Sequence, residues 1–326
     1  MKKILKVLLI IIAAAVGGLA VILLYVKEGL PSVGAAPDIK VDRTNGRVER
    51  GKYLANHVAA CMDCHSQRDW TVYGAPIKEG TFGGGGEKFG KEMGFPGTLY
   101  SRNLTPYGLS GWTDGEIFRA ITTGQNKTND ALFPLMPYLH YGTMDQEDIY
   151  SIIAYLRTLP AIANKVPERT LDFPVNFIVN TIPQKAVLSP KPATTDPVQY
   201  GKYLVTVADC VACHSRVDEH GEIIAGSEFG GGRSFNFPNG TVVTTPNITS
   251  DVETGIGSWT NELFLRKFKR FSDSAYHEQK LGPNDFNTPM PWFMFAGMDS
   301  SDLTAIFSYL QTVKKIKNDV KRFAKR

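Results

Sequence analysis

The longest apolar stretch of the chain lies at its N-terminus. A basic segment that ends at Lys6 comes before an uncharged run from Val7 to Val26, which is 20 residues long. About 20 helical residues cross the hydrocarbon core of a bilayer, so the run predicts an uncleaved transmembrane anchor. A cleavable signal peptide has a shorter apolar region, and its cleavage site has only two weak candidates here, Ser32-Val33-Gly34-Ala35 and Gly34-Ala35-Ala36. Because the lysines precede the run, the rest of the chain is expected on the outer side of the membrane.

Two later segments carry apolar residues at i, i+3, i+4 and i+7, which is the pattern of an amphipathic helix. They are Ile149, Ile152, Ile153 and Leu156 in the first segment and Leu303, Ile306, Phe307 and Leu310 in the second. Further helices are expected to begin near Gly51, at Thr113 and at Thr260. Since no segment shows convincing strand alternation, the predicted fold class is all-α.

The body of the chain is a tandem repeat, because short sequences return in the same order in its second half. The pairs are Gly51-Lys52-Tyr53-Leu54 with Gly201-Lys202-Tyr203-Leu204, Phe82-Gly83-Gly84-Gly85 with Phe229-Gly230-Gly231-Gly232, and Met136-Pro137-Tyr138 with Met290-Pro291-Trp292. This duplication predicts an anchor at 1–28, a tether at 29–46, a first domain at 47–160, a linker at 161–196, a second domain at 197–313 and a basic tail at 314–326.

All four cysteines of the chain fall in two C-x-x-C-H motifs. The motifs are Cys61, Cys64 and His65 in the first repeat, and Cys210, Cys213 and His214 in the second. This pattern is typical of covalent c-type haem attachment, in which the cysteines form thioethers and the histidine binds the iron. The alternative is one zinc site built from both pairs. The motifs predict two covalently bound haem c groups.

Charge adds little to this picture. The formal net charge of +4 is too small to indicate nucleic-acid binding. The glycine-rich loops lack the strand, helix and Lys-Ser/Thr context of a nucleotide-binding loop. The basic tail is interpreted as a solvated helix end, and docking to an acidic partner or anionic lipid is the alternative.

The motifs and their order resemble a known family. Each repeat is similar to a class I cytochrome c domain, with a helix, C-x-x-C-H, a middle helix, a Met-containing loop and a last helix. The whole order, with Gly-Ile-Gly-Ser-Trp-Thr at 255–260, resembles the cytochrome c subunits of membrane-bound alcohol and aldehyde dehydrogenases and freestanding dihaem cytochromes. The resemblance implies two tandem class I cytochrome c domains behind a transmembrane helix, facing the periplasm from the bacterial inner membrane.

The resemblance also implies a methionine ligand opposite each histidine. Met136 and Met290 lie in proline-flanked loops ahead of the last helices, where the distal methionine of the family sits. A thioether ligand raises the reduction potential of haem iron. Met144 and Met298 are rivals, but they directly precede candidate N-cap aspartates and are better explained as staples to those helices. Met294 competes in the second repeat only.

The second ring nitrogen of an iron-bound histidine usually donates to an acceptor that orients the ring. In class I cytochromes this acceptor is often a proline carbonyl, and Pro76 fits in the first repeat. Ala225 stands at the corresponding position of the second repeat, so the acceptor there is open. None of the other four histidines recurs in both repeats. Bis-histidine ligation of one haem is the minor alternative, with His140 as its candidate.

The predicted function is the relay of single electrons between redox proteins, without catalysis, because the haem itself carries the chemistry. Expected partners are a terminal oxidase, a soluble cytochrome or a dehydrogenase subunit, and the alternative is the cytochrome c subunit of a periplasmic dehydrogenase complex. A dihaem peroxidase is disfavoured. Such an enzyme needs one haem with a displaceable, non-methionine ligand, whereas the two Met loops are alike.

Overall fold

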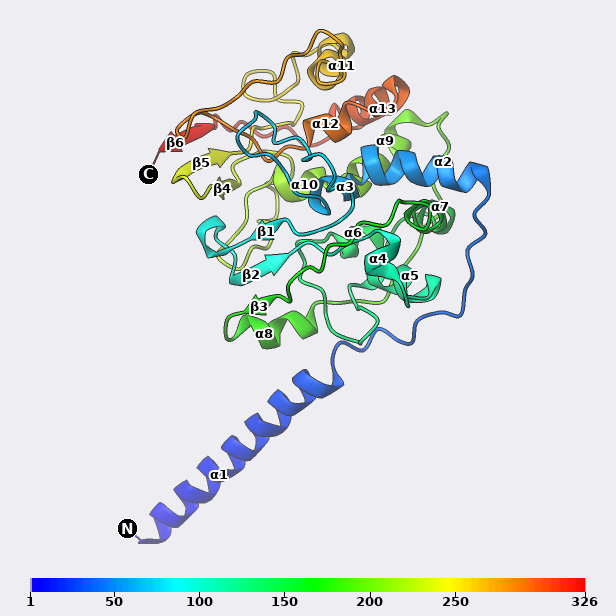
Figure 1. Cartoon of the computed structure of the whole chain (residues 1–326). Coiled ribbons are helices and arrows are strands. Elements are labelled where there is room, and N and C mark those ends of the chain that lie inside the picture. The colour runs from blue at the N-terminus through cyan, green and yellow to red at the C-terminus, as the bar shows by residue number, and fades with distance from the viewer. Residues whose placement is uncertain (1, 326) are drawn as a thin grey trace. The chain divides into compact units, whose positions relative to one another are not determined.

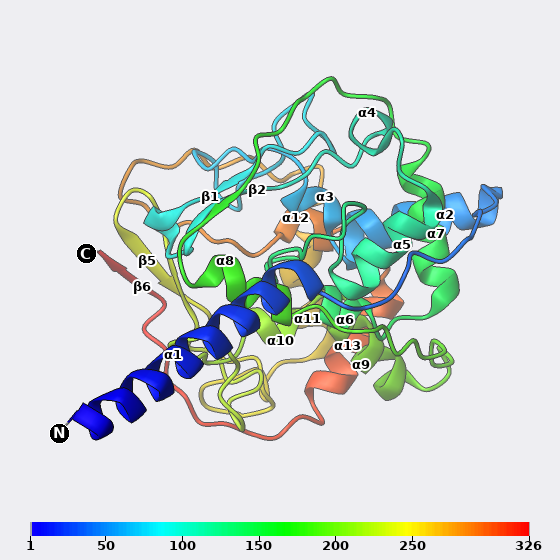
Figure 2. The ribbon, with the colours of Figure 1, turned by 90° about the horizontal axis from the view of Figure 1, so that it is seen from below.

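The computed structural model describes residues 2–325 and divides into two compact units. The first unit comprises the chain up to Ile39, Trp112–Thr143 and Thr170–Val187. The second comprises Lys40–Gly111, Met144–Arg169 and the chain from Leu188 onward. Figures 1 and 2 label the elements of both units. The domain boundaries given above stay a prediction.

The first unit begins with the long helix α1 (Lys2–Leu24), which continues as one π-helical turn, η1 (Tyr25–Gly29) (Figure 1). No residue of α1 is buried. The 28 residues Lys2–Gly29 are long and apolar enough to cross a membrane. A signal sequence has the same features, so the helix indicates either an anchor or a signal sequence.

The remainder of the first unit folds around a capped helix. Its elements are α5 (Asp114–Thr123), α6 (Tyr138–Tyr141), β3 (Thr170–Leu171), α8 (Val175–Ile178) and the 3-10 turn η4 (Val179–Thr181). As predicted, α5 starts with a reciprocal capping box between Thr113 and Glu116. The tether packs against this helix, because Gln125 donates to the carbonyl of Pro31 at 2.9 Å and Arg119 donates to that of Gly34 at 3.3 Å.

The second unit contains both C-x-x-C-H motifs and most of the helices. Its helices are α2 (Asn45–Tyr53), η2 (Leu54–Val58), α3 (Cys61–Cys64), η3 (Lys91–Met93), α4 (Pro106–Leu109), α7 (Gln146–Leu156), α9 (Pro197–Val207), α10 (Cys210–Cys213), α11 (Asn261–Lys269), α12 (Trp292–Phe295) and α13 (Ser300–Leu310). The two helices predicted from apolar spacing are α7 and α13, and their existence is confirmed.

A glycine brings each first helix close to the last helix of its repeat. Helix α2 packs on α7 at Gly51, where an added Cβ would lie 1.8 Å from the carbonyl oxygen of Ser151. Helix α9 packs on α13 at Gly201, where a Cβ would lie 1.9 Å from the carbonyl oxygen of Ala305. No side chain fits at either crossing, which explains why the repeated Gly-Lys-Tyr-Leu sequence begins with glycine.

The prediction of an all-α fold is wrong, because the chain also forms two small antiparallel sheets. Strand β1 (Lys88–Phe89) pairs with β2 (Gly97–Tyr100) in the first sheet. In the second, β4 (Ser234–Asn236) pairs with β5 (Thr241–Thr244), and β5 pairs with the C-terminal strand β6 (Phe323–Lys325). Strands of two to four residues are too short to show a period of two, so no alternating pattern predicts them.

Candidate functional site

The two C-x-x-C-H motifs adopt the same local structure. Each forms a single helical turn, α3 or α10, after a residue with left-handed backbone: Ala60 (φ 49°) and Asp209 (φ 52°). The first cysteine of each motif is half-buried and the second is exposed. This conformation presents two thiols and one imidazole from the same short segment, as covalent haem attachment requires.

Each motif histidine is oriented by a backbone carbonyl. His65 Nδ1 lies 2.7 Å from the carbonyl oxygen of Arg102, and His214 Nδ1 lies 2.9 Å from that of Pro246. Because a carbonyl only accepts, Nδ1 carries the proton and the lone pair of Nε2 is left for a metal. Burial lowers the pKa of both imidazoles, which keeps them in the neutral form that binds iron.

The acceptor inferred for the first repeat was wrong. Pro76 accepts a hydrogen bond from the backbone of Asp69 at 2.8 Å, and Arg102 takes the role assigned to Pro76. In the second repeat the open position is filled by Pro246. Arg102 and Pro246 directly precede two matching sequences, Asn103-Leu104-Thr105 and Asn247-Ile248-Thr249, so the two acceptors are equivalent. A backbone carbonyl has no side-chain signature, and sequence spacing could not identify it.

The glycine-rich loops hold these acceptors in place. The backbone amides of Gly85 and Gly231 donate to the carbonyls of His65 and His214, each at 2.8 Å. Both glycines have positive φ, and a Cβ would lie 2.5–2.6 Å from the backbone that carries the acceptor carbonyl. Only glycine combines this backbone conformation with such close contact.

The hydrogen bonds pair the residues of the two glycine-rich loops differently from the sequence match, by one position. The amide of Gly83 donates to the hydroxyl oxygen of Ser66 at 2.9 Å, and the amide of Phe229 donates to that of Ser215 at 3.1 Å. Phe229, with φ 63°, is therefore the structural equivalent of Gly83 rather than of the preceding phenylalanine. Matching letters alone misaligned the loops, because both contain runs of glycine.

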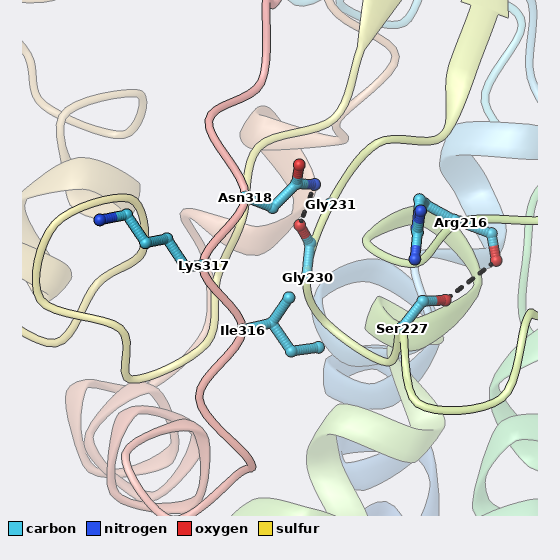
Figure 3. Close-up of a pocket in the computed structure, with 7 residues that line it drawn as sticks. All are labelled: Arg216, Ser227, Gly230, Gly231, Ile316, Lys317 and Asn318. Atoms are coloured by element: carbon cyan, nitrogen blue, oxygen red, sulfur yellow. Dashed lines mark hydrogen bonds between the residues drawn. The ribbon is translucent and has the colours of Figure 1, made fainter.

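The C-terminal segment covers the second glycine-rich loop. Figure 3 shows Asn318 donating to the carbonyl of Gly230, at 2.8 Å, while Ile316 packs on the same glycine. These residues line a cavity of about 110 Å³ together with Arg216, Ser227, Gly231 and Lys317. That volume is well below the roughly 300–1,000 Å³ of small-molecule sites, so we assign no ligand to it. The segment is packed and ends in β6, which contradicts its interpretation as a solvated helix end.

A buried ion pair distinguishes the first motif from the second. Asp63 lies between Cys61 and Cys64, and its Oδ2 is 2.8 Å from Arg68, with both side chains over 90% buried. Burial raises the pKa of Asp63 to about 6, and the guanidinium of Arg68 offsets part of that shift. Ala212 occupies the same position in the second motif. The two sites thus share their geometry and differ in their buried charge.

The two Met loops also share their local structure. The carbonyl of Met136 accepts from Tyr138, and that of Met290 accepts from Trp292, both at 2.8 Å, and both methionines are half-buried. Met290 and His214 belong to the second unit, whereas Met136 belongs to the first unit and His65 to the second. The assignment of both methionines as ligands stays a proposal. Trp292 Nε1 is buried without a partner, and an acceptor on a bound group would satisfy it.

Rival sites gain no support from the described residues. Across residues 2–325, no three His, Cys, Asp or Glu side chains are grouped as a metal site, so nothing there favours the zinc alternative. Met144 and Met298 are each 1% exposed, and they directly precede the N-cap residues of α7 and α13. Their role as staples stays a prediction. Asp145 caps α7 through its side chain, whereas Asp299 makes no such bond to α13.

These features fit covalent c-type haem attachment, and the chain is similar to cytochrome c subunits among known proteins. No family model matches the chain. The chain is 27% identical over 82% of its length to the fructose dehydrogenase cytochrome subunit of Gluconobacter japonicus, covering 52% of that protein. It is also 27% identical over 82% of its length to the gluconate 2-dehydrogenase cytochrome c subunit of Pantoea cypripedii, covering 59% of it.

A third relative is the cytochrome c subunit of the alcohol dehydrogenase (quinone) of Gluconacetobacter polyoxogenes, 25% identical over 84% of this chain and 58% of that protein. The chain therefore spans a little over half the length of these curated relatives. Its homologues are cytochrome c subunits of dehydrogenases, which confirms the predicted resemblance and implies covalently bound haem c.

Proposed function

We propose that the chain is a dihaem cytochrome c that relays single electrons between redox proteins. The observation that carries this proposal is the duplicated site, in which a C-x-x-C-H turn and a carbonyl-held histidine occur twice with the same geometry. A non-redox role would not need two such sites in one chain. When bound, haem c supplies a one-electron couple between Fe(II) and Fe(III).

In this proposal the protein would attach each haem covalently, supply ligands to its iron and orient the ligating imidazole. Cys61 and Cys64 would hold one haem through thioethers, and Cys210 and Cys213 the other. The Nδ1 bonds to carbonyls fix the plane of each imidazole and direct Nε2 at the metal. The soft sulfurs of Met136 and Met290 would complete the coordination and favour Fe(II). No residue is assigned to catalysis.

The partner is proposed from the relatives. Their names identify cytochrome subunits of fructose, gluconate and alcohol dehydrogenases. We therefore favour a dehydrogenase subunit as the electron donor, and a terminal oxidase or soluble cytochrome as the acceptor. The freestanding carrier and the dehydrogenase subunit differ only in whether the donor is bound permanently.

The location is proposed from the first helix. The apolar segment Lys2–Gly29 would anchor the chain in the bacterial inner membrane as a single span. The basic residues before it favour a cytoplasmic N-terminus, which leaves both C-x-x-C-H motifs in the periplasm.

Counting the haems tests the proposal. The purified chain is expected to carry two covalent haems by intact mass and by haem absorbance per chain. Replacing Cys61 and Cys64 with serine should remove one haem, and replacing Cys210 and Cys213 should remove the other. Met136→Leu and Met290→Leu should each leave both haems attached but convert one to a high-spin form. A wild-type chain with fewer than two covalent haems would refute the proposal.

A further inference from the structure

The repeated Gly-Lys-Tyr-Leu sequence carries a tyrosine that the site does not use. Tyr53 is the last residue of α2, and Tyr203, the matching residue of the repeated sequence, lies within α9. The Tyr53 hydroxyl donates to Asp302 Oδ2 at 2.8 Å and accepts from the amide of Asp299 at 3.0 Å. Tyr53 belongs to the first repeat and both aspartates to the second, so this contact joins the repeats.

The tyrosine of the second repeat makes the matching contact with the first repeat. The Tyr203 hydroxyl donates to Asp148 Oδ2 at 2.7 Å and is hydrogen-bonded to the backbone of Asp145. Asp148 and Asp302 are equivalent positions in α7 and α13, and they are only 1% and 7% exposed. Each repeat thus inserts its tyrosine at the start of the last helix of the other, and the two contacts are reciprocal.

Buried bonds of this kind have large energetic consequences. A hydrogen bond to a charged group stabilises more than one between neutral groups, and a buried carboxylate left without a donor is destabilising. Tyr53 is the closest donor on Asp302, since Tyr200 lies at 3.4 Å. Asp148 has further donors in Arg50 and Lys191, at 2.8 and 3.1 Å. We expect the bond of Tyr53 to matter more than that of Tyr203.

Helices α2 and α9, which contain the two tyrosines, are followed closely by the C-x-x-C-H motifs. Helix α2 runs through η2 to Cys61, and α9 is followed within three residues by Cys210. Both motifs lie in the second unit. Fixing α2 and α9 on the partner repeats therefore fixes the motifs relative to each other.

We propose that Tyr53 and Tyr203 are positioning residues, which hold the two C-x-x-C-H segments at one separation and orientation so that electrons pass directly between the haems attached there. This inference rests on the proposed function. Electron tunnelling falls steeply with distance, and a mobile pair would exchange electrons only in its closed arrangement. The reciprocal tyrosines keep that arrangement populated.

Other contacts between the repeats should keep the variants folded. His57 Nδ1 lies 2.8 Å from the carbonyl oxygen of Met294. Asn287, from the second repeat, bonds the amide of Gly74 at 2.9 Å and the carbonyls of Trp70 and Val72 at 3.1 and 3.2 Å. None of these bonds involves the tyrosines, and a Tyr→Phe change retains the ring.

The test compares Tyr53→Phe, Tyr203→Phe and the double variant in the full chain with both haems attached. Pulsed electron paramagnetic resonance would give the distribution of distances between the two oxidised haems. Rapid reduction of one haem would give the rate of internal electron transfer. We expect the double variant to broaden the distribution and to raise the ratio of open to closed arrangements about tenfold, which corresponds to a loss of about 1.4 kcal/mol. The transfer rate should fall with the closed fraction.

The control is Tyr150→Phe, on the same helix as Asp148. Its hydroxyl accepts from Gln146 at 2.9 Å within one repeat, and its removal should leave the distance distribution and the rate unchanged. Double-variant values within twofold of wild type, with two haems per chain, would overturn the positioning role and leave the proposed function intact. If the double variant does not fold, the single variants decide, with the larger effect expected for Tyr53→Phe. A wild-type chain that lacks one haem would overturn both proposals.

Discussion

At the residue scale, the equivalent aspartates Asp148 and Asp302 have opposite electrostatic surroundings. Burial alone would raise the pKa of Asp148, but hydrogen bonds and charge from Arg50, with help from Tyr203 and Lys191, hold it below its usual value. Burial raises the pKa of Asp302, and the bonds from Tyr53 and Tyr200 offset only part of that. The difference arises because Tyr200 occupies the position of Arg50 in the second repeat.

The two carboxylates should therefore affect stability over pH in opposite ways. The contribution of Asp148 is present above its unfolded pKa of about 3.9 and is lost as the pH falls through its lower folded pKa. The contribution of Asp302 is full below about 3.9 and is lost as the pH rises through its higher folded pKa. We expect Asp148→Asn to cost about 3–5 kcal/mol at pH 7, because it leaves Arg50 without its buried partner.

Unfolding by urea between pH 3 and pH 8 measures this difference. The free-energy gap between wild type and Asp148→Asn should shrink as the pH falls, whereas the gap for Asp302→Asn should shrink as the pH rises. If both free-energy gaps changed with pH in the same direction, the opposite pKa shifts assigned to Asp148 and Asp302 would be wrong.

At the residue scale, only part of the candidate site could be predicted from the sequence. The C-x-x-C-H residues are identified by their types and spacing. The acceptor carbonyls of Arg102 and Pro246 could not be identified, because any residue supplies a carbonyl. The pair of Tyr53 and Asp302 did leave a signal, since both residues recur in the other repeat, but a recurring tyrosine does not reveal which repeat it contacts.

At the element scale, the close contact of α2 with α7 predicts how a glycine substitution changes the stability of the chain. Gly51→Ala should destabilise the chain by about 2–3 kcal/mol, because its Cβ would lie 1.8 Å from the carbonyl oxygen of Ser151 and force α2 away from α7. Gly46→Ala is the matched control in the same helix, where an added Cβ meets nothing within 4 Å. That variant should be neutral or up to about 1 kcal/mol more stable. Equal effects in denaturant unfolding would show that the crossing is not close-packed.

Helices could be predicted where the spacing of apolar residues continued over two turns or more. The four apolar positions of α7 are all buried, and those of α13 are buried except for Phe307. The strands were missed because the longest have four residues and because β6 pairs with β5 from far along the chain. Short segments paired across long sequence distances leave no local periodicity to detect.

At the scale of the whole molecule, the membrane anchor is testable by truncation. The full-length chain should fractionate with membranes. A variant that starts at Leu30 behind a cleavable signal peptide should be soluble and keep its haem spectrum, because it retains Pro31 and Gly34, whose carbonyls Gln125 and Arg119 bond. Membrane-extracted protein whose N-terminal sequence begins near Ala35 would show that the apolar helix is removed.

An electron relay of this kind requires two reversible one-electron centres in one chain, and a coulometric titration followed by absorbance is the direct test. We predict that two electrons enter each chain, that both haems are low-spin when reduced, and that peroxide oxidises them only stoichiometrically. Uptake of a single electron, or rapid catalytic consumption of peroxide with a high-spin signal after one haem is reduced, would contradict the electron relay.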